Sequence, residues 1–253
     1  MTRHDRWNAL LELLARDGRL EVEEAAEALD VSAATIRRDL DQLAGRQLLL
    51  RTRGGAVAHG VSYELPLRYK TARRAPEKQR IAKAVAELLA PGEVVGFTGG
   101  TTTTETARAL ALRDEPFTVV TNALNIANEL AVRPQVKIVL TGGVARPQSF
   151  ELIGPLAMGV LNEVALDVAV LGVNGVDVEG GLTAHHEGEA SINRALAERA
   201  RRVVVAADSS KVGSVAFARI CSLDAVDVLV TDEGLEPAAA ERITEAGVRV
   251  MTV

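Results

Sequence analysis

The apolar positions in the first part of the chain predict three short helices. Residues 6–14, 21–29 and 33–43 each place apolar side chains three and four positions apart, on one face of a helix. Gly18 follows the first stretch and is expected to cap it in the left-handed conformation. Ser32 precedes the third and is a good N-cap, because its hydroxyl can accept from an unpaired backbone N–H. The short turn between the second and third helices is that of a helix-turn-helix.

The third predicted helix has one apolar side and one polar side. The polar side is expected to carry Thr35, Arg37, Arg38, Asp39 and Gln42. A capped helix of this kind, third in a small helical unit, is what enters the major groove of DNA, although charged helix faces are often simply solvated. We expect Asp39 to pair with Arg37 or Arg38, because a carboxylate facing phosphate would be repelled.

A hairpin is predicted after the third helix, because two short apolar runs flank Gly54-Gly55. Three helices followed by a hairpin make a winged helix-turn-helix, expected over residues 1–58. Arg51 and Arg53 lie on the wing, where they can meet phosphate or the minor groove. Residues 59–76 have no clean periodicity and are interrupted by glycine and proline, so they are expected to be a linker.

The remainder, residues 77–253, alternates between helical and strand-like patterns. Residues 77–89 are predicted to form a helix after Pro76. Apolar, β-branched runs, each predicted to be a strand, then occur at 93–97, 117–120, 136–140, 168–171, 203–206, 226–230 and 248–253. Helical stretches lie between most of them, which is typical of a Rossmann-like, mainly parallel α/β sheet covered on both faces.

Small and polar residues follow several predicted strands, at the edge where such sheets bind ligands. Residues 98–104 contain two glycines and five threonines before a helix, which predicts a cradle for an anion. The loop is not a Walker A motif, because no Gly-Lys-Ser/Thr follows. Residues 121–122, 141–143 and 208–211 end three further strands. Each alone would be an ordinary capping turn, but together they predict a site for a small, phosphorylated, hydroxyl-rich molecule.

Composition narrows the class of protein. The 253 residues are 47% hydrophobic but only 3% aromatic, so the core must consist of Ala, Val, Leu and Ile. The net charge of -5 excludes a globally basic nucleic-acid binder, so any DNA contact must come from locally arranged arginines. A single cysteine, Cys221, fits a reducing cytosol. With no signal-like or membrane-spanning stretch we expect a cytoplasmic protein without a membrane partner, and we expect no metal site and no cofactor.

The third helix and the wing together resemble the DeoR family of bacterial transcription regulators. The family pattern Ser-x-x-Thr-Ile-Arg-Arg-Asp-Leu matches residues 32–40, and Arg-x-x-Gly-Gly-Ala matches the wing that ends at Ala56. The resemblance implies a double-stranded DNA operator as partner, with Ser32, Thr35, Arg37 and Arg38 facing it. An arginine can read guanine with two hydrogen bonds, whereas serine and threonine more often contact phosphate.

The second half is similar to the sensor domain of the same family, through Gly-Thr-Thr-Thr, Val-Thr-Asn, Gly-Gly and Asp-Ser-Ser-Lys in that order. That domain resembles the ribose-5-phosphate isomerase and CoA-transferase folds and binds sugar phosphates as effectors. The resemblance therefore implies a small phosphorylated sugar held by Gly99, Gly100, Thr101, Thr102, Thr103, Thr121, Asn122, Gly142, Gly143, Glu189, Asp208 and Lys211.

Two departures from the family pattern concern this pocket. Thr98 stands where many members have Asp, and Asn193 and Arg194 stand where many have Lys. Both changes weaken any case for isomerase chemistry, which needs a positioned base. His185-His186 lies nearby and is either a solvated pair or a phosphate contact that would make the response depend on pH.

The sequence thus predicts a repressor of a carbohydrate-utilisation operon, regulated by a sugar phosphate and without catalytic residues. Paired operator half-sites need paired readers, so a homodimer or homotetramer is expected. Two alternatives stay open. One is a sugar-phosphate isomerase-like enzyme with a DNA-binding appendage, using Glu187, Glu189 or Asp208 as its carboxylate. The other is an activator with the same two domains.

Overall fold

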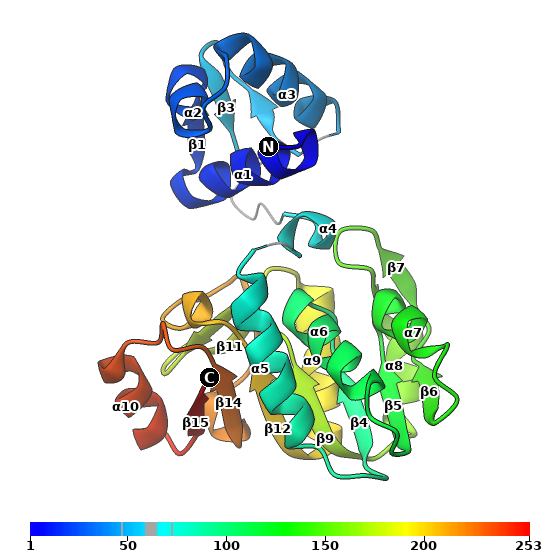
Figure 1. The fold of residues 1–253 in the computed structure, drawn as a ribbon. Helices are drawn as coiled ribbons and strands as arrows, with labels where there is room; N and C mark the ends of the chain where they lie inside the picture. The colour runs from blue at the N-terminus through cyan, green and yellow to red at the C-terminus, as the bar shows by residue number, and fades with distance from the viewer. Residues whose placement is uncertain (47, 59–64, 72) are drawn as a thin grey trace. The chain divides into compact units, whose positions relative to one another are not determined.

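The computed structural model describes residues 1–46, 48–58, 65–71 and 73–253. They form two compact units, residues 1–73 and residues 74–253 (Figure 1). The boundary falls inside the segment expected to be a linker.

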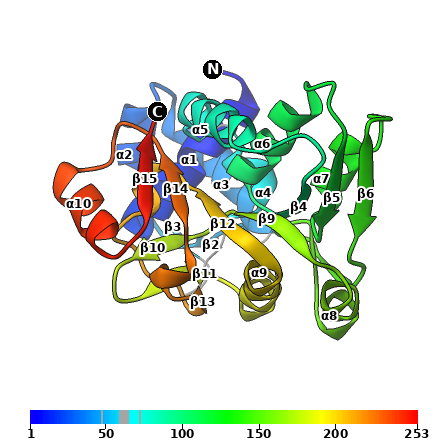
Figure 2. The same cartoon turned by 90° about the horizontal axis from the view of Figure 1, so that it is seen from below.

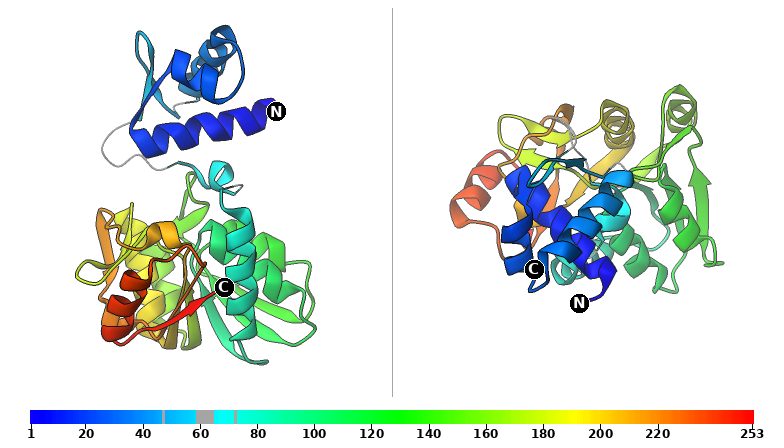
Figure 3. Two further views of the ribbon diagram at one scale, coloured as in Figure 1. Left: turned by 60° about the vertical axis from the view of Figure 1, so that its left-hand side comes forward. Right: turned by 90° about the horizontal axis from the view of Figure 1, so that it is seen from above.

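The first unit contains the three helices and the hairpin that the sequence predicts. Gly18 caps the first helix in the left-handed conformation (φ 71°), and Ser32 Oγ accepts from the Thr35 N–H at 3.2 Å, so both predicted caps are confirmed. Figure 3 (left) shows the long first helix, in blue, with the shorter elements packed on one side of it. In chain order the elements are α1 (Arg3–Asp17), β1 (Arg19–Glu21), α2 (Val22–Ala28), α3 (Ala33–Gly45), β2 (Leu50–Arg51), β3 (Gly55–Val57) and α4 (Leu67–Lys70).

The sequence does not predict strand β1, which turns the hairpin into a three-stranded sheet. β1 pairs antiparallel with β3, giving the order β1-β3-β2. Gly55 lies where these strands come closest, because a Cβ there would be 1.7 Å from the carbonyl oxygen of Leu20. Glycine at this position therefore allows the wing to approach β1.

The apolar stripes of the three helices meet in one core. Leu65 and Tyr69, from the segment expected to be a linker, are each 3% exposed and belong to the same core. Residues 65–71 of that segment are therefore tied to the first unit, whereas residues 74–76 belong to the second, and residues 59–64 and 72 lie outside the described residues. The fully buried side chains of this core include Leu10, Leu11, Leu14, Ile36, Leu40 and Leu43.

Asp39 lies inside the first unit, so the prediction that it pairs with Arg37 or Arg38 is wrong. Its Oδ1 accepts from Trp7 Nε1 at 2.8 Å, and its Oδ2 accepts from Nε of Arg6. The side chain of Asp39 is only 4% exposed. Its position three residues after one buried apolar residue and four before another puts it on the inner face of α3. A carboxylate there needs partners, because an unpaired buried charge is very costly.

All seven runs predicted as strands form the central sheet of the second unit. Every neighbouring pair is parallel, in the order β15-β14-β12-β9-β4-β5-β6. This confirms the prediction of a mainly parallel α/β domain. The strands are β4 (Val94–Phe97), β5 (Phe117–Thr121), β6 (Val136–Leu140), β9 (Leu166–Leu171), β12 (Ala200–Ala206), β14 (Val228–Thr231) and β15 (Arg249–Thr252).

Helices cover both faces of the sheet. Side chains of α5, α6 and α7 pack in one core and those of α8, α9 and α10 in another, and Figure 2 shows α5 and α6 across the strands from α9. Val168 and Val170 of β9 join the first core, whereas Ala169 and Leu171 join the second, because successive strand side chains point to opposite faces. The helices are α5 (Ala75–Glu87), α6 (Thr101–Ala111), α7 (Leu124–Leu130), α8 (Pro155–Asn162), α9 (Glu187–Arg199) and α10 (Pro237–Glu245).

Two small antiparallel sheets are absent from the sequence prediction. The first is a hairpin and the second has the order β10-β11-β13. Their strands have three or four residues each, too few to show a period of two. They are β7 (Val144–Arg146), β8 (Glu151–Ile153), β10 (Gly175–Asp177), β11 (Gly181–Ala184) and β13 (Ala218–Cys221). Across the described parts of both units, no helix combines the length and apolarity needed to cross a membrane.

Replacing Asp39 by Ala should destabilise the first unit by about 2 kcal/mol, because Trp7 and Arg6 lose a charged acceptor. Trp7 is the single tryptophan, so its fluorescence in a urea titration reports this unfolding. Asp41→Ala is the matched control, since Asp41 pairs with Arg51 but is 66% exposed and exposed pairs contribute about 0.2–1 kcal/mol. Equal losses in the two variants would contradict an interior role for Asp39.

Candidate functional site

The outer face of α3 presents a mixed set of hydrogen-bond donors. Ser32 Oγ and Thr35 Oγ1 lie 2.9 Å apart at the start of the helix, where backbone N–H groups also lack helical partners. Arg37 donates to Glu23 Oε1 of α2 at 2.7 Å, and both side chains are more than half exposed. Arg38 is exposed. Among the described residues it has no partner, so it offers an unoccupied guanidinium on this face.

The two arginines predicted on the wing differ in their contacts. Arg51 of β2 donates through Nε to Asp41 Oδ1 of α3 at 2.8 Å and also donates to the Gly55 carbonyl. The side chain of Arg51 therefore connects the wing to α3. Arg53, in the turn between β2 and β3, is exposed and pairs with none of the residues that the structure describes. Arg53 can reach a phosphate without giving up a partner, whereas Arg51 cannot.

In the second unit, the parallel strands bring most of the predicted effector residues to one edge of the sheet. β4 lies between β9 and β5. The connection that leaves β4 leads to β5 on one side, whereas the chain that leaves β9 continues to β12 on the other side. Ligands of open α/β sheets bind at such a switch point, outside the carboxyl ends of the strands. The predicted residues at this edge are Gly99, Gly100, Thr101, Thr102 and Thr103 after β4, Thr121 and Asn122 at the end of β5, Gly142 and Gly143 after β6, and Asp208 and Lys211 after β12.

Thr98 joins the loops that follow β4 and β9. Its side chain is fully buried, and its Oγ1 accepts from the Gly172 N–H at 2.8 Å. The hydroxyl at the position where an acid is common in the family is thus used to hold the switch point together. Gly100, two residues later, has a φ of 136° and leads directly into α6, a backbone conformation that favours glycine.

The hydroxyls of several threonines at this edge are occupied by the backbone. Thr103 Oγ1 and Thr104 Oγ1 donate to the Gly100 carbonyl, at 3.1 and 2.5 Å. Thr121 Oγ1 donates to the Phe97 carbonyl at 2.8 Å. An anion bound here would therefore be held by the free N–H groups at the start of α6 more than by these hydroxyls.

Glu151 of β8 is a buried carboxylate beside the cradle that the sequence prediction misses. It is 5% exposed, and its Oε2 accepts from Asn122 Nδ2 at 3.0 Å. A Cβ on Gly99 would lie 2.3 Å from the Glu151 side chain, so the glycine makes room for this carboxylate. A carboxylate in this place can accept hydrogen bonds from ligand hydroxyls.

Arg146 of β7 brings the predicted Glu189 into the same region. Arg146 NH1 lies 2.8 Å from Glu189 Oε1 in the first turn of α9, with side chains 14% and 5% exposed. Arg146 and Glu151 face each other across the β7-β8 hairpin. The hairpin therefore carries a cation and an anion side by side.

His185 and His186, which were also singled out near α9, have structural roles. His186 Nδ1 accepts from the Gly188 N–H at 3.0 Å and caps α9, so it is neither merely solvated nor turned to a ligand through that atom. The backbone N–H of His185 donates to Asn174 Oδ1 at 3.1 Å. Asn193 is 3% exposed, and its Oδ1 finds no hydrogen-bond partner within the described residues.

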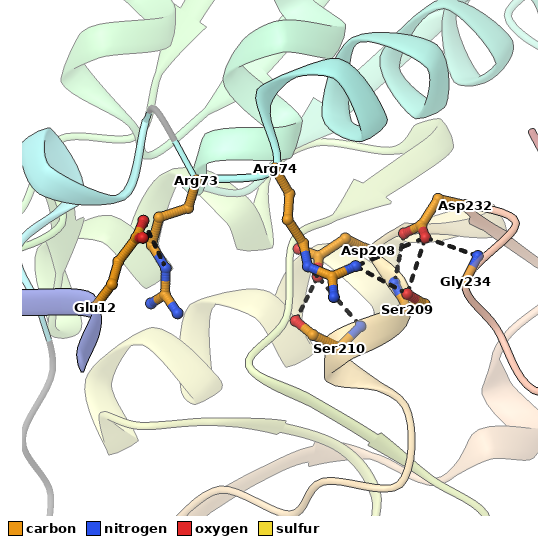
Figure 4. A network of polar contacts seen from close by, with 8 residues as sticks. All are labelled: Glu12, Arg73, Arg74, Asp208, Ser209, Ser210, Asp232 and Gly234. Atoms are coloured by element: carbon orange, nitrogen blue, oxygen red, sulfur yellow. Dashed lines mark hydrogen bonds and ion pairs between the residues drawn. The ribbon is translucent and has the colours of Figure 1, made fainter. Parts of the chain in front are cut away.

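Two buried aspartates organise the ends of β12 and β14 (Figure 4). Asp208 Oδ1 accepts from the Ser210 N–H at 3.2 Å, and Asp232 accepts from the Ser209 N–H at 2.7 Å. Arg74 lies against both, and its NH1 donates to Ser209 Oγ at 3.1 Å. Burial raises the pKa of Asp232, but hydrogen bonds from Ser209 and a second backbone N–H, together with the charge of Arg74, outweigh it and hold that pKa below its ordinary value.

The residues that the sequence prediction misses fall into two groups. Gly172 directly follows one predicted strand and Asp232 lies two residues after another, so the strand-end rule that identified Asp208 applies to both. Arg146 and Glu151 lie on a hairpin that the pattern does not predict, and no local signal marks them. Among the described residues, no group of three or more His, Cys, Asp and Glu side chains is arranged to hold a metal ion.

Thr98→Val should lower the unfolding free energy of the second unit by about 1 kcal/mol, because the Gly172 N–H loses its acceptor. Thr118→Val on β5 is the matched control, since its half-buried hydroxyl bonds none of the described residues. Chemical denaturation followed by circular dichroism measures both variants. An unchanged free energy in Thr98→Val would show that the two loops do not depend on this hydroxyl.

Comparison with known proteins identifies both units. Residues 6–60 match the DeoR-like helix-turn-helix domain, and residues 73–233 match the DeoR C terminal sensor domain. The chain is 36% identical to the glycerol-3-phosphate regulon repressor of Escherichia coli (strain K12), over 92% of each chain. It is 38% identical to the HTH-type transcriptional regulator GlpR of Haloferax volcanii, over 98% of this chain and 96% of that one. Ribose 5 phosphate isomerase A from Neisseria gonorrhoeae is similar over 54% of this chain and 53% of that one, with 21% identity and a TM-score of 0.42. The chain belongs to the DeoR family of transcriptional regulators.

Proposed function

We propose that this regulator represses a carbohydrate-utilisation operon and releases its operator when a phosphorylated sugar or polyol binds the second unit. The observation that carries the proposal is the mixed charge at the carboxyl edge of the sheet. The start of α6, Lys211 and Arg146 supply anion-binding groups there, and Glu151 and Asp208 supply carboxylates. A phosphorylated sugar needs both kinds of group, because its phosphate accepts hydrogen bonds and its hydroxyls donate them.

The relatives favour repression over activation. One of them is named for a glycerol-3-phosphate regulon that it represses. That name makes glycerol 3-phosphate the first ligand to test here, and the polar edge described above has the charge to hold a small phosphorylated polyol. A repressor and an activator would use the same two units, so a promoter-reporter assay with and without the gene distinguishes them.

Operator binding is assigned to the first unit, with α3 in the major groove and the wing beside it. Ser32 and Thr35 would contact phosphate at the start of α3, Arg37 and Arg38 would face the groove, and Arg53 would reach the backbone. An operator with two-fold symmetry binds two copies of the DNA-binding unit, so we propose a homodimer or homotetramer. Such an oligomer can hold its two DNA-binding units in an arrangement that fits the operator or in one that does not. The ligand changes operator affinity only if it binds one of these arrangements more tightly than the other.

Arg38→Ala should weaken operator binding by about 1–3 kcal/mol and relax specificity at one base position, if its guanidinium reads a guanine. The operator is obtained by selection from random duplexes with the purified protein, and binding is measured by fluorescence anisotropy at one fixed salt concentration. Arg16→Ala is the matched control, because it removes an exposed arginine that lies in the last turn of α1 and outside α3 and the wing. An equal loss on operator and random duplex would assign Arg38 to phosphate instead.

A thermal-shift screen tests the effector. Glycerol 3-phosphate, ribose 5-phosphate and fructose 1-phosphate are each compared with the unphosphorylated compound and with inorganic phosphate. A ligand at about 100 times its dissociation constant stabilises the native state by about 2.7 kcal/mol, so one phosphorylated compound should raise the melting temperature. Lys211→Ala should abolish that shift because it removes a cation from the strand-end site.

Lys137→Ala is the control for this screen, because Lys137 is an exposed lysine near the start of β6, at the end opposite the carboxyl edge. A shift that survives in Lys211→Ala would place the ligand elsewhere. If no phosphorylated compound shifts the wild-type protein, the proposed class of effector is wrong, whereas the assignment of DNA binding to the first unit is unaffected.

A further inference from the structure

Neighbouring arginines at the boundary are fixed to different units. Arg73 is the last residue of the first unit, where its Nε lies 3.5 Å from Glu12 Oε1 of α1. Arg74 is the first residue of the second unit, where its side chain points toward Asp208 and Asp232 (Figure 4). A displacement of residue 74 is therefore passed through one peptide bond to a residue that is paired with α1.

The contacts of Arg74 with the two aspartates are long and partly solvated. Its Nε lies 3.8 Å from Asp208 Oδ1 and its NH1 lies 3.7 Å from Asp232 Oδ1, whereas charge-assisted hydrogen bonds are about 2.7–2.9 Å long. The arginine side chain is 44% exposed, but the two aspartates are only 5% and 4% exposed. The guanidinium is thus the more movable member of this cluster.

The two aspartates stay anchored when the arginine moves. Asp232 accepts from the backbone N–H groups of Ser209 and Gly234, at 2.7 and 3.0 Å. Asp208 accepts from the N–H of Ser210. These bonds lie within the turns after β12 and β14, so departure of Arg74 removes one partner from each carboxylate and leaves the turns in place.

The backbone of Arg74 is held in an unusual conformation. It has φ 47° and ψ 41°, in the left-handed region, and it precedes α5 without making a side-chain cap. Residues with a Cβ seldom adopt this region and remain there only when the surroundings hold them. Its carbonyl accepts from the Lys78 N–H of α5 at 3.0 Å, and its side chain contacts Ser209 and the two aspartates. Losing the side-chain contacts removes part of what holds this backbone and lets it relax.

We propose that Arg74 transmits occupancy of the effector site to the DNA-reading unit. The inference rests on the proposed function, because it assigns to the strand-end site a phosphoryl group that takes the guanidinium from Asp208 and Asp232. Phosphate is a better partner for arginine than these distant carboxylates, since the planar guanidinium can bind it with two parallel hydrogen bonds. Residue 74 moves with its side chain, and the start of the second unit moves with residue 74.

The test is the effect of ligand on operator affinity in the full-length protein. Operator binding of wild type and Arg74→Gln is titrated without ligand and with saturating glycerol 3-phosphate, ribose 5-phosphate or fructose 1-phosphate, saturation being established for each variant by thermal shift. Coupling between two sites typically changes affinity about 5–150-fold. We expect at least a tenfold loss of operator affinity in wild type with one of these ligands, and less than a threefold loss in Arg74→Gln.

Two further variants keep the result interpretable. Arg201→Gln removes an 86% exposed arginine from the opposite end of β12 and should keep the full response. Arg74→Gly permits the left-handed backbone without the side chain, so it should fold even if Arg74→Gln does not, and it should lose the response.

The outcomes separate the two proposals. A full response in a folded Arg74 variant that still binds the ligand overturns the role of Arg74 and leaves the proposed function intact. A wild-type protein that shows no thermal shift and no change in operator affinity with any of the three ligands overturns the proposed function, and the role of Arg74 with it.

Discussion

The second unit depends on the parallel pairing of β4 with β9 on one side and β5 on the other. This arrangement places the loops after β4 and β9 on either side of a switch point. The connections lead away from this point in opposite directions, which leaves a crevice outside the carboxyl ends of the strands. Thr98 and Gly172 bridge the two loops with a hydrogen bond just beyond the last paired residues of β4 and β9. The loops after β4, β5 and β9 take their positions from that pairing, since parallel strands bring their carboxyl ends together.

Buried charge sets the second constraint, because a charge removed from water must find a partner. In the first unit Asp39 meets Trp7 and Arg6 and so ties α3 to α1. In the second unit Arg146 and Glu189 join the β7-β8 hairpin to α9. These pairs connect segments far apart in the sequence. They fix the position of α3 in the first unit and of the β7-β8 hairpin in the second.

Local pattern was sufficient wherever an element buries one regular face. The seven β-branched runs are the seven strands of the sheet, and Gly18 and Ser32 cap the helices that they were expected to cap. The pattern was insufficient for β1, whose partner β3 is distant in sequence, and for the β7-β8 hairpin, whose three-residue strands are too short to show a period of two. For the same reason Glu151 could not be assigned to the ligand edge before the hairpin was known.

The sequence by itself determined the two-domain architecture, the family and the strand ends that the parallel sheet brings to one edge, because these follow from periodicity and short motifs. Only the tertiary structure decided which polar atoms remain available. It engages the hydroxyls of Thr103 and Thr121 with backbone carbonyls, turns Asp39 inward, and places Arg74 against the turns after β12 and β14. A side chain's partners depend on what folding brings within hydrogen-bond distance, and that information is not contained in any local stretch of sequence.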